Sequence, residues 1–143
     1  MYETILVPTD GSEQAETALT HAIDLAGRYD ATLHVLYVVD TGSMAAAGID
    51  GAALLDELED TGETILSRAV ETVTGADLDV ERALDYGSPH EKIREYVDTN
   101  GIDLVVMGTH GRRGLGRYLL GSVTERVIRT VPVPVLAVRS VSK

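Results

Sequence analysis

Short apolar runs recur along this chain and predict the strands of a sheet. Four of these runs are continuous, which is typical of strands buried on both faces of a parallel sheet. They span Thr4 to Pro8, Thr32 to Val39, Leu104 to Met107 and Val133 to Val138. A fifth run, Leu78 to Leu84, alternates apolar and polar positions and therefore predicts a half-exposed edge strand.

Between these runs, apolar residues recur at helical spacing and predict amphipathic helices that lie on the sheet. The first helix begins at Ser12, a good N-cap residue, and ends between Gly27 and Asp30. The second runs from Leu54 to Val73 and contains Gly62, which costs about 1 kcal/mol relative to Ala in a helix.

The third helix carries a sharp start signal. Ser88 suits the N-cap, Pro89 the first helical position and Glu91 the closing position of a capping box, while Gly101 is a good stop. Before the second helix, Thr41 to Ala53 is rich in Gly and Ala without a periodic pattern. We interpret that segment as a mobile loop with room for a helical turn.

The last helix is predicted from Ser122, which forms a second capping-box pattern with Glu125, to Val131, before Pro132. With it, strands and helices alternate strictly, an order that calls for a parallel sheet with right-handed crossovers. We therefore expect one α/β domain over residues 1–143, a three-layer, doubly wound, five-stranded sheet. Ligands of such sheets bind beyond the carboxyl ends of the strands, where the strand order reverses.

A glycine-rich segment at this edge of the sheet carries the strongest chemical signal. It spans Gly108 to Gly121, follows a predicted strand and leads into the helix at Ser122. Glycines let the backbone approach a ligand closely, and the free N–H groups of a helix start attract anions. The segment therefore predicts a phosphate site.

Composition limits the class of protein. The chain has 143 residues, 44% of them hydrophobic, and no cysteine, so the redox compartment cannot be inferred. It shows no apolar run long enough to span a membrane and no signal-peptide pattern, so we expect a cytoplasmic protein without membrane contact. The net charge of −11 argues against nucleic-acid binding.

The charge is unevenly distributed. Residues 1–107 carry a net charge of −17, whereas residues 108–143 carry +6. One interpretation is a basic, solvated face on the last helix. The other is a phosphate site, favoured because Arg112, Arg113 and Arg117 lie within the glycine segment and arginine suits phosphate. The abundance of acidic residues and scarcity of lysine fit either a protein from a salt-loving organism or an ordinary acidic cytoplasmic one.

Two prolines mark the last strand as an edge. Pro132 and Pro134 bracket its start, and proline cannot donate a hydrogen bond to a neighbouring strand. The prolines could simply protect this edge. We favour instead a homodimer that forms through Val133 to Val138, because an apolar edge strand invites pairing with a second copy.

The glycine spacing resembles a known family. Gly108, Gly111, Gly121 and Ser122 match the GxxGx9G(S/T) signature of the ATP-binding branch of the universal stress protein (UspA-like) family. The resemblance extends along the whole chain and includes PTDGS at the first strand, HVLYVVD at the second, GSPHE at the third helix and SVTERVIRTVPVPVLAV at the end. It implies a Rossmann-like sheet with strand order 3-2-1-4-5.

The resemblance also implies a ligand, ATP or its relatives AMP and ADP, with Mg²⁺ or Mn²⁺. It places Pro8, Thr9 and Asp10 beside the adenosine, Asp10 near ribose or metal, and the backbone of Val38 against adenine. The ribose and phosphates would be wrapped by residues from the glycine segment and the following helix: Met107, Gly108, Thr109, His110, Gly111, Arg112, Arg113, Gly114, Gly121, Ser122, Val123 and Thr124. Direct phosphate contacts from Arg112 and Arg113 are our inference, because the family varies there.

Several of these residues have simpler alternatives. Ser122 could act only as an N-cap, and Asp10 only as a turn residue. His110 could contact a phosphate or be an exposed loop histidine, and His34, which alternates with apolar neighbours, is interpreted as structural. Ser122 and Thr124 are expected to add hydroxyl donors to the phosphate site.

The sequence favours a binding module over an enzyme. It lacks the Walker lysine pattern, and a GxGxxG does not follow the first strand. The expected function is a nucleotide-dependent sensor or regulatory module of the stress response, with at most slow ATP hydrolysis. The alternatives are an ATP-consuming α/β enzyme, such as a nucleotidyl transferase, and a stress protein that binds another ligand.

Overall fold

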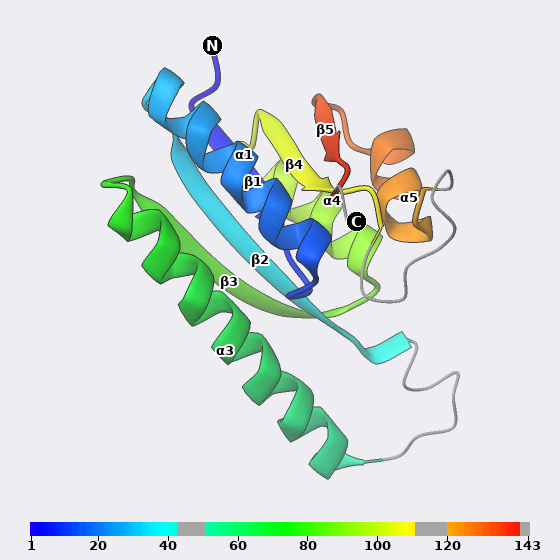
Figure 1. The fold of residues 1–143 in the computed structure, drawn as a ribbon. Helices are drawn as coiled ribbons and strands as arrows, with labels where there is room; N and C mark the ends of the chain where they lie inside the picture. The colour runs from blue at the N-terminus through cyan, green and yellow to red at the C-terminus, as the bar shows by residue number, and fades with distance from the viewer. Residues whose placement is uncertain (43–50, 111–119, 141–143) are drawn as a thin grey trace.

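The computed structural model describes residues 1–42, 51–110 and 120–140. A parallel five-stranded sheet in the order β3-β2-β1-β4-β5 forms its centre, as predicted (Figure 1). The strands are β1 Thr4–Pro8, β2 Thr32–Asp40, β3 Val80–Gly87, β4 Leu104–Gly108 and β5 Val135–Val138. The helices are α1 Glu13–Tyr29, α3 Ala52–Gly75, α4 Pro89–Asn100 and α5 Ser122–Thr130.

The helices cover both faces of the sheet. α1 and α3 lie on one face, and α4 and α5 lie on the other (Figure 1). Ile5 and Val7 point into a first core beneath α1 and α3, whereas Leu6 points into a second core beneath α4 and α5. This alternation explains why the apolar run of β1 is continuous: both faces of the strand are buried.

The edge strands differ from their predicted bounds. β3 was expected at Leu78 to Leu84 but covers Val80–Gly87, because the long β2 pairs with it from Leu33↔Val80 to Asp40↔Gly87. Its position at an edge is confirmed.

β5 was expected from Val133 but begins at Val135. The carbonyl of Pro134 still accepts a hydrogen bond from the N–H of Val105, at 3.0 Å. The proline has no N–H to donate, so regular pairing starts after it.

One predicted N-cap forms and one predicted capping box does not. Ser12 caps α1, and its hydroxyl accepts from the N–H of Ala15 at 3.2 Å. Ser88 occupies the N-cap of α4 with Pro89 after it, but its side chain makes no capping hydrogen bond and lies 3.1 Å from Nδ1 of His90. The capping box with Glu91 was therefore wrong, because the histidine ring takes the serine hydroxyl.

Gly62 has a packing role that the sequence did not reveal. It is buried in α3, and a Cβ there would lie 2.6 Å from Cδ1 of Tyr37 on β2. The absence of a side chain lets α3 approach the sheet. Among the described residues, no helix is long and apolar enough to cross a membrane.

Candidate functional site

The pairing of β1 with β4 stops before the carboxyl ends of the two strands. The register of these strands contains Ile5↔Leu104 and Leu6↔Val105, whereas β1 stays paired with β2 up to Pro8↔Leu36. Along a strand of a parallel sheet, the N–H and C=O groups of successive residues point alternately to the two neighbouring strands. Thr9 donates to Leu36 on β2, so the backbone of the preceding residue, Pro8, faces β4. Because proline has no N–H, it deprives the β1–β4 pairing of a donor at this point. We call the region between the unpaired ends of β1 and β4 the crevice.

Backbone groups from both sides face the crevice. The N–H of Thr9 donates to the carbonyl of Leu36 at 2.9 Å, so the backbone of Leu36 faces β1. The same alternation turns the backbone of Val38 to that side, beyond the last paired residue of β1. Val105 and Thr109 both donate toward β5, which turns the backbone of Gly108 toward β1. Val38 and Gly108 thus present backbone groups from opposite sides.

The turn after β1 forms the floor of the crevice. Gly11 has φ +79°, a conformation that favours glycine, and its N–H donates to Oγ1 of Thr9 at 3.1 Å. Oδ1 of Asp10 accepts from the N–H of Ser12 at 2.9 Å. Asp10 is therefore part of the turn itself, the simpler role considered above, which leaves a ligand contact from its carboxylate as a proposal.

The two ends of the glycine segment are tied together beside the crevice. The N–H of Gly121 donates to the carbonyl of Thr109 at 2.7 Å, and the N–H of Thr109 donates to the carbonyl of Val138 at 3.0 Å. A Cβ on Gly121 would lie 3.0 Å from Cα of His110, so a side chain there would push the two ends apart. Nδ1 of His110 is hydrogen-bonded to Oγ1 of Thr109, at 3.1 Å.

The second predicted capping box, between Ser122 and Glu125, does not form at the start of α5. Gly121 is the N-cap, Ser122 is the first helical residue and is exposed, and no side chain caps the helix. Glu125 donates its N–H to the carbonyl of Gly121 and pairs with Arg129 at 2.8 Å, one turn later. The N–H groups of the first helical turn precede this first intrahelical bond, and N–H groups in that position can attract an anion.

The hydroxyl of Thr124 was expected to donate to phosphate, but in the structure it has a partner within the protein. Thr124 is 3% exposed, and its Oγ1 donates to the carbonyl of Gly108 at 2.9 Å. The hydroxyl proton is thus used within the protein. What Thr124 offers to a ligand at the helix start is its backbone N–H.

Most of the predicted site residues lie in the part of the chain that the structure describes, and the others lie outside it. The structure brings Pro8, Thr9, Asp10 and Val38 to the same edge of the sheet as β4 and the start of α5, with Met107, Gly108, Thr109, His110, Gly121, Ser122, Val123 and Thr124. Gly111, Arg112, Arg113 and Gly114 lie outside the described residues. The side chain of Met107 is buried in the second core, which places it beneath the crevice.

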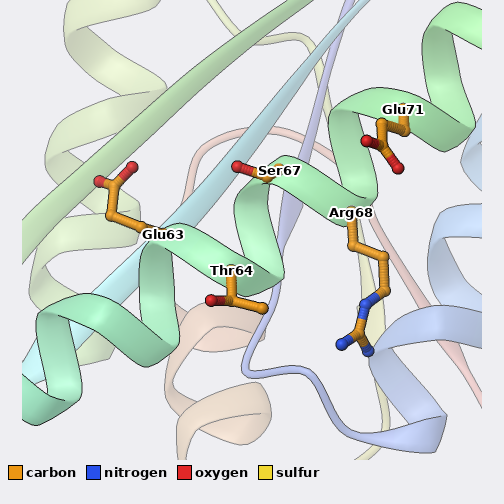
Figure 2. A pocket seen from close by; sticks show the side chains of 5 residues that line it. All are labelled: Glu63, Thr64, Ser67, Arg68 and Glu71. Atoms are coloured by element: carbon orange, nitrogen blue, oxygen red, sulfur yellow. The ribbon is translucent and has the colours of Figure 1, made fainter.

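Two hollows in the described surface differ in how they relate to the crevice. One, of about 380 Å³, is lined by residues of α3 alone, with Arg68 and Thr64 on one side of the helix and Glu63, Ser67 and Glu71 on the other (Figure 2). The other, of about 270 Å³, lies between α1 and α3 and reaches Thr9 and Gly11. A hollow along a single exposed helix cannot enclose a ligand, so the first is not a candidate site.

The chain matches known proteins along its length. A sequence profile of the Universal stress protein family matches residues 1–139. Universal stress protein MJ0531 of Methanocaldococcus jannaschii is 36% identical over 145 residues, which cover 100% of this chain and 85% of that protein.

Solved structures agree with these sequence matches. Hypothetical protein MJ0577 superposes with a TM-score of 0.89 at 31% identity, covering 100% of this chain and 99% of that one. A universal stress protein in complex with cAMP superposes with a TM-score of 0.71 at 28% identity, covering 96% of this chain and 97% of that one.

Proposed function

We propose that this chain, which belongs to the universal stress protein family, binds ATP in the crevice and acts as a nucleotide-dependent sensor or regulatory module of the stress response. The observation that carries the proposal is the pair of backbone surfaces, Val38 and Gly108, that face each other where β1 ends. The related structure with cAMP supports a ligand of this class, a nucleotide with an adenine ring and a phosphate.

Each part of ATP has a matching surface in this proposal. Adenine meets the backbone of Val38, and the adenosine lies over Pro8, Thr9 and Asp10. The phosphates meet the start of α5, where the N–H groups of Ser122 to Thr124 and the positive end of the helix dipole attract an anion. The remaining contacts come from Met107, Gly108, Thr109, His110 and Gly121, and from Gly111, Arg112, Arg113 and Gly114.

A metal ion would enter with the nucleotide. The described residues hold no group of three or more metal-binding side chains. Mg²⁺ is commonly held by substrate phosphates together with one or two carboxylates, a pattern that needs no dedicated protein cage. Asp10, at the floor of the crevice, is the residue that would supply such a carboxylate to Mg²⁺ or Mn²⁺.

Calorimetric titration and thermal shift with ATP and Mg²⁺ test the proposal. ATP at 100 times its dissociation constant should stabilise the protein by about 2.7 kcal/mol and raise the unfolding midpoint by about 5–11 °C. Gly121→Val should abolish that shift, because the side chain would separate Gly121 from His110. Arg28→Ala is the matched control and should keep the shift, because Arg28 lies in the last turn of α1, near the amino ends of the strands. A wild-type protein that shows no response to ATP and Mg²⁺ would contradict the proposal.

Phosphate release distinguishes the proposed module from an ATP-consuming enzyme. In-line phosphoryl transfer needs a positioned nucleophile as well as a charge clamp. Asp10 and His110, titratable side chains at the described crevice, are already hydrogen-bonded, Asp10 within its turn and His110 to Thr109. We therefore expect slow hydrolysis at most. Steady turnover above about 1 per second, a typical enzyme rate, would favour the enzyme instead.

The proposal includes a cytoplasmic homodimer that pairs through Val133 to Val138. β5 is an edge strand, and Leu136 on it is 39% exposed. Leu136→Glu would place a charge in that interface and should convert the dimer into a monomer, as measured by analytical ultracentrifugation. Tyr86→Ser removes a similarly exposed side chain from the opposite edge strand, β3, and should leave the dimer intact. A monomeric wild type would exclude the dimer.

A further inference from the structure

We propose that Thr124 is a positioning residue for nucleotide binding: its hydroxyl fixes the first turn of α5 against the end of β4. The inference rests on the proposed function, because it concerns the helix start that would meet the phosphates. Oγ1 of Thr124 donates to the carbonyl of Gly108 at 2.9 Å, and the side chain is 3% exposed.

The carbonyl of Gly108 needs this donor. It faces the β1 side of β4, but β1 ends at Pro8 and its pairing with β4 ends at Leu6↔Val105. A buried backbone carbonyl without a donor is costly, and the great majority of such groups are paired. The buried side chain of Thr124 supplies that donor.

The Thr124 bond is one of three that lock the start of α5. The N–H of Gly121 holds the carbonyl of Thr109, and the N–H of Thr109 holds the carbonyl of Val138 on β5. These two bonds join backbone groups, so no substitution other than proline removes their donors. The third bond is made by a side chain, so a substitution at position 124 can test the whole arrangement.

Fixing this turn matters because anion binding by backbone N–H groups depends on direction. Hydrogen bonds weaken steeply as the donor angle falls below about 120°. The N–H groups of Ser122, Val123 and Thr124 share one helical turn, so a rotation of that turn would misalign all three at once. A functional site needs its binding groups held within about 0.5 Å, and the bond from Thr124 provides that restraint.

Three variants separate positioning from general stability. Thr124→Val keeps the shape but loses the hydroxyl and should raise the Kd for ATP with Mg²⁺ about tenfold, which corresponds to about 1.4 kcal/mol. Thr124→Ser restores the hydroxyl and should return the Kd to within about twofold of wild type. Val127→Ala opens a cavity at a fully buried position one turn further along α5 and should lower the unfolding midpoint without changing the Kd by more than about twofold.

Amide hydrogen exchange without nucleotide gives a second readout. Thr124→Val should speed exchange at the N–H groups of Gly121 and Thr109 more than Val127→Ala does. If Thr124→Val matches wild type in Kd, or if Thr124→Ser binds as weakly as Thr124→Val, the inference is overturned. If wild type binds no ATP, the proposed function fails instead, and faster exchange at Gly121 then decides alone whether Thr124 holds the turn.

Discussion

Gly108 and Gln14 meet where α1 crosses the end of β4. A Cβ added to Gly108 would lie 2.7 Å from Cβ of Gln14 and 3.1 Å and 3.2 Å from its backbone C and O atoms. These last two are backbone atoms, which cannot swing aside as the end of a side chain can. The glycine that begins the proposed phosphate segment is therefore required by helix packing as well.

Gly108→Ala should destabilise the protein with or without nucleotide. The added methyl group would force α1 away from the sheet, and overpacking of this kind typically costs about 1–3 kcal/mol. Urea unfolding measures the change in the free energy of unfolding.

Gly27→Ala is the matched control for Gly108→Ala. Gly27 lies in α1 and is exposed, and a Cβ there would meet no atom within 4 Å. This substitution should raise stability by up to about 1 kcal/mol, because alanine favours a helix. Equal effects of the two substitutions would show that contact with Gln14 does not decide the cost.

Gly62→Ala should also lower the free energy of unfolding, by about 1–3 kcal/mol, contrary to its effect on an isolated helix. The new Cβ would lie 2.6 Å and 2.8 Å from two ring atoms of Tyr37 and 3.0 Å from Cδ1 of Leu84. Thermal or urea unfolding checks the sign. Gly75→Ala, at the end of the same helix with no atom within 4 Å, should not destabilise; if both variants gain stability, the close packing at Gly62 is wrong.

The glycines show what the sequence could and could not predict. The elements and the strand order were predictable, because apolar periodicity, turn residues and strict alternation are local signals, and the family resemblance supplied the order. The contacts of Gly62 with Tyr37 and of Gly108 with Gln14 were not, because each joins residues that are far apart in the chain. A glycine in a helical pattern looks like a weak point until its neighbour across the core is known.

The crevice shows the same division. The motif brought Pro8, Val38 and Gly121 to attention, and strand topology explains why they meet at one edge. It did not show that Gly121 rather than Ser122 is the N-cap of α5, because the two choices differ by a single residue in where the helix begins. Nor did it reveal the inward direction of the Thr124 hydroxyl, which depends on the carbonyl of Gly108 that β1 leaves without a partner.

Salt should raise the stability of this acidic chain. Its net charge is −11, and residues 1–107 carry −17, so carboxylates repel one another in the folded state. Raising KCl from about 0.01 M to 1 M shortens the Debye length from about 30 Å to 3 Å. The Tm should rise over this range, and sucrose, which screens no charge, serves as the control for solvent effects. A Tm that falls or stays constant with KCl would argue against a salt-adapted protein.

A half-buried pair, His34 and Tyr96, should make stability depend on pH. His34 on β2 points toward α4, where its Nδ1 is hydrogen-bonded to the hydroxyl of Tyr96 at 2.7 Å. The two rings also make an edge contact, with centroids 5.5 Å apart. Burial lowers the pKa of His34 below its ordinary value of 6.5, and the neighbouring Glu81 partly opposes that shift. The folded state thus favours the neutral ring.

The sign of the pH effect follows from that lowered pKa. Above pH 6.5 the ring is neutral in both the folded and the unfolded chain, and its contribution to stability is fully present. As the pH falls below 6.5, the unfolded chain binds a proton more readily than the folded one, so the free energy of unfolding decreases. Urea unfolding from pH 7.5 to 5.0 should show a steeper loss in wild type than in His34→Gln, which keeps a polar side chain but cannot titrate there. The difference between the two isolates His34, since the carboxylates are common to both. Parallel curves would show that His34 has the same pKa in both states.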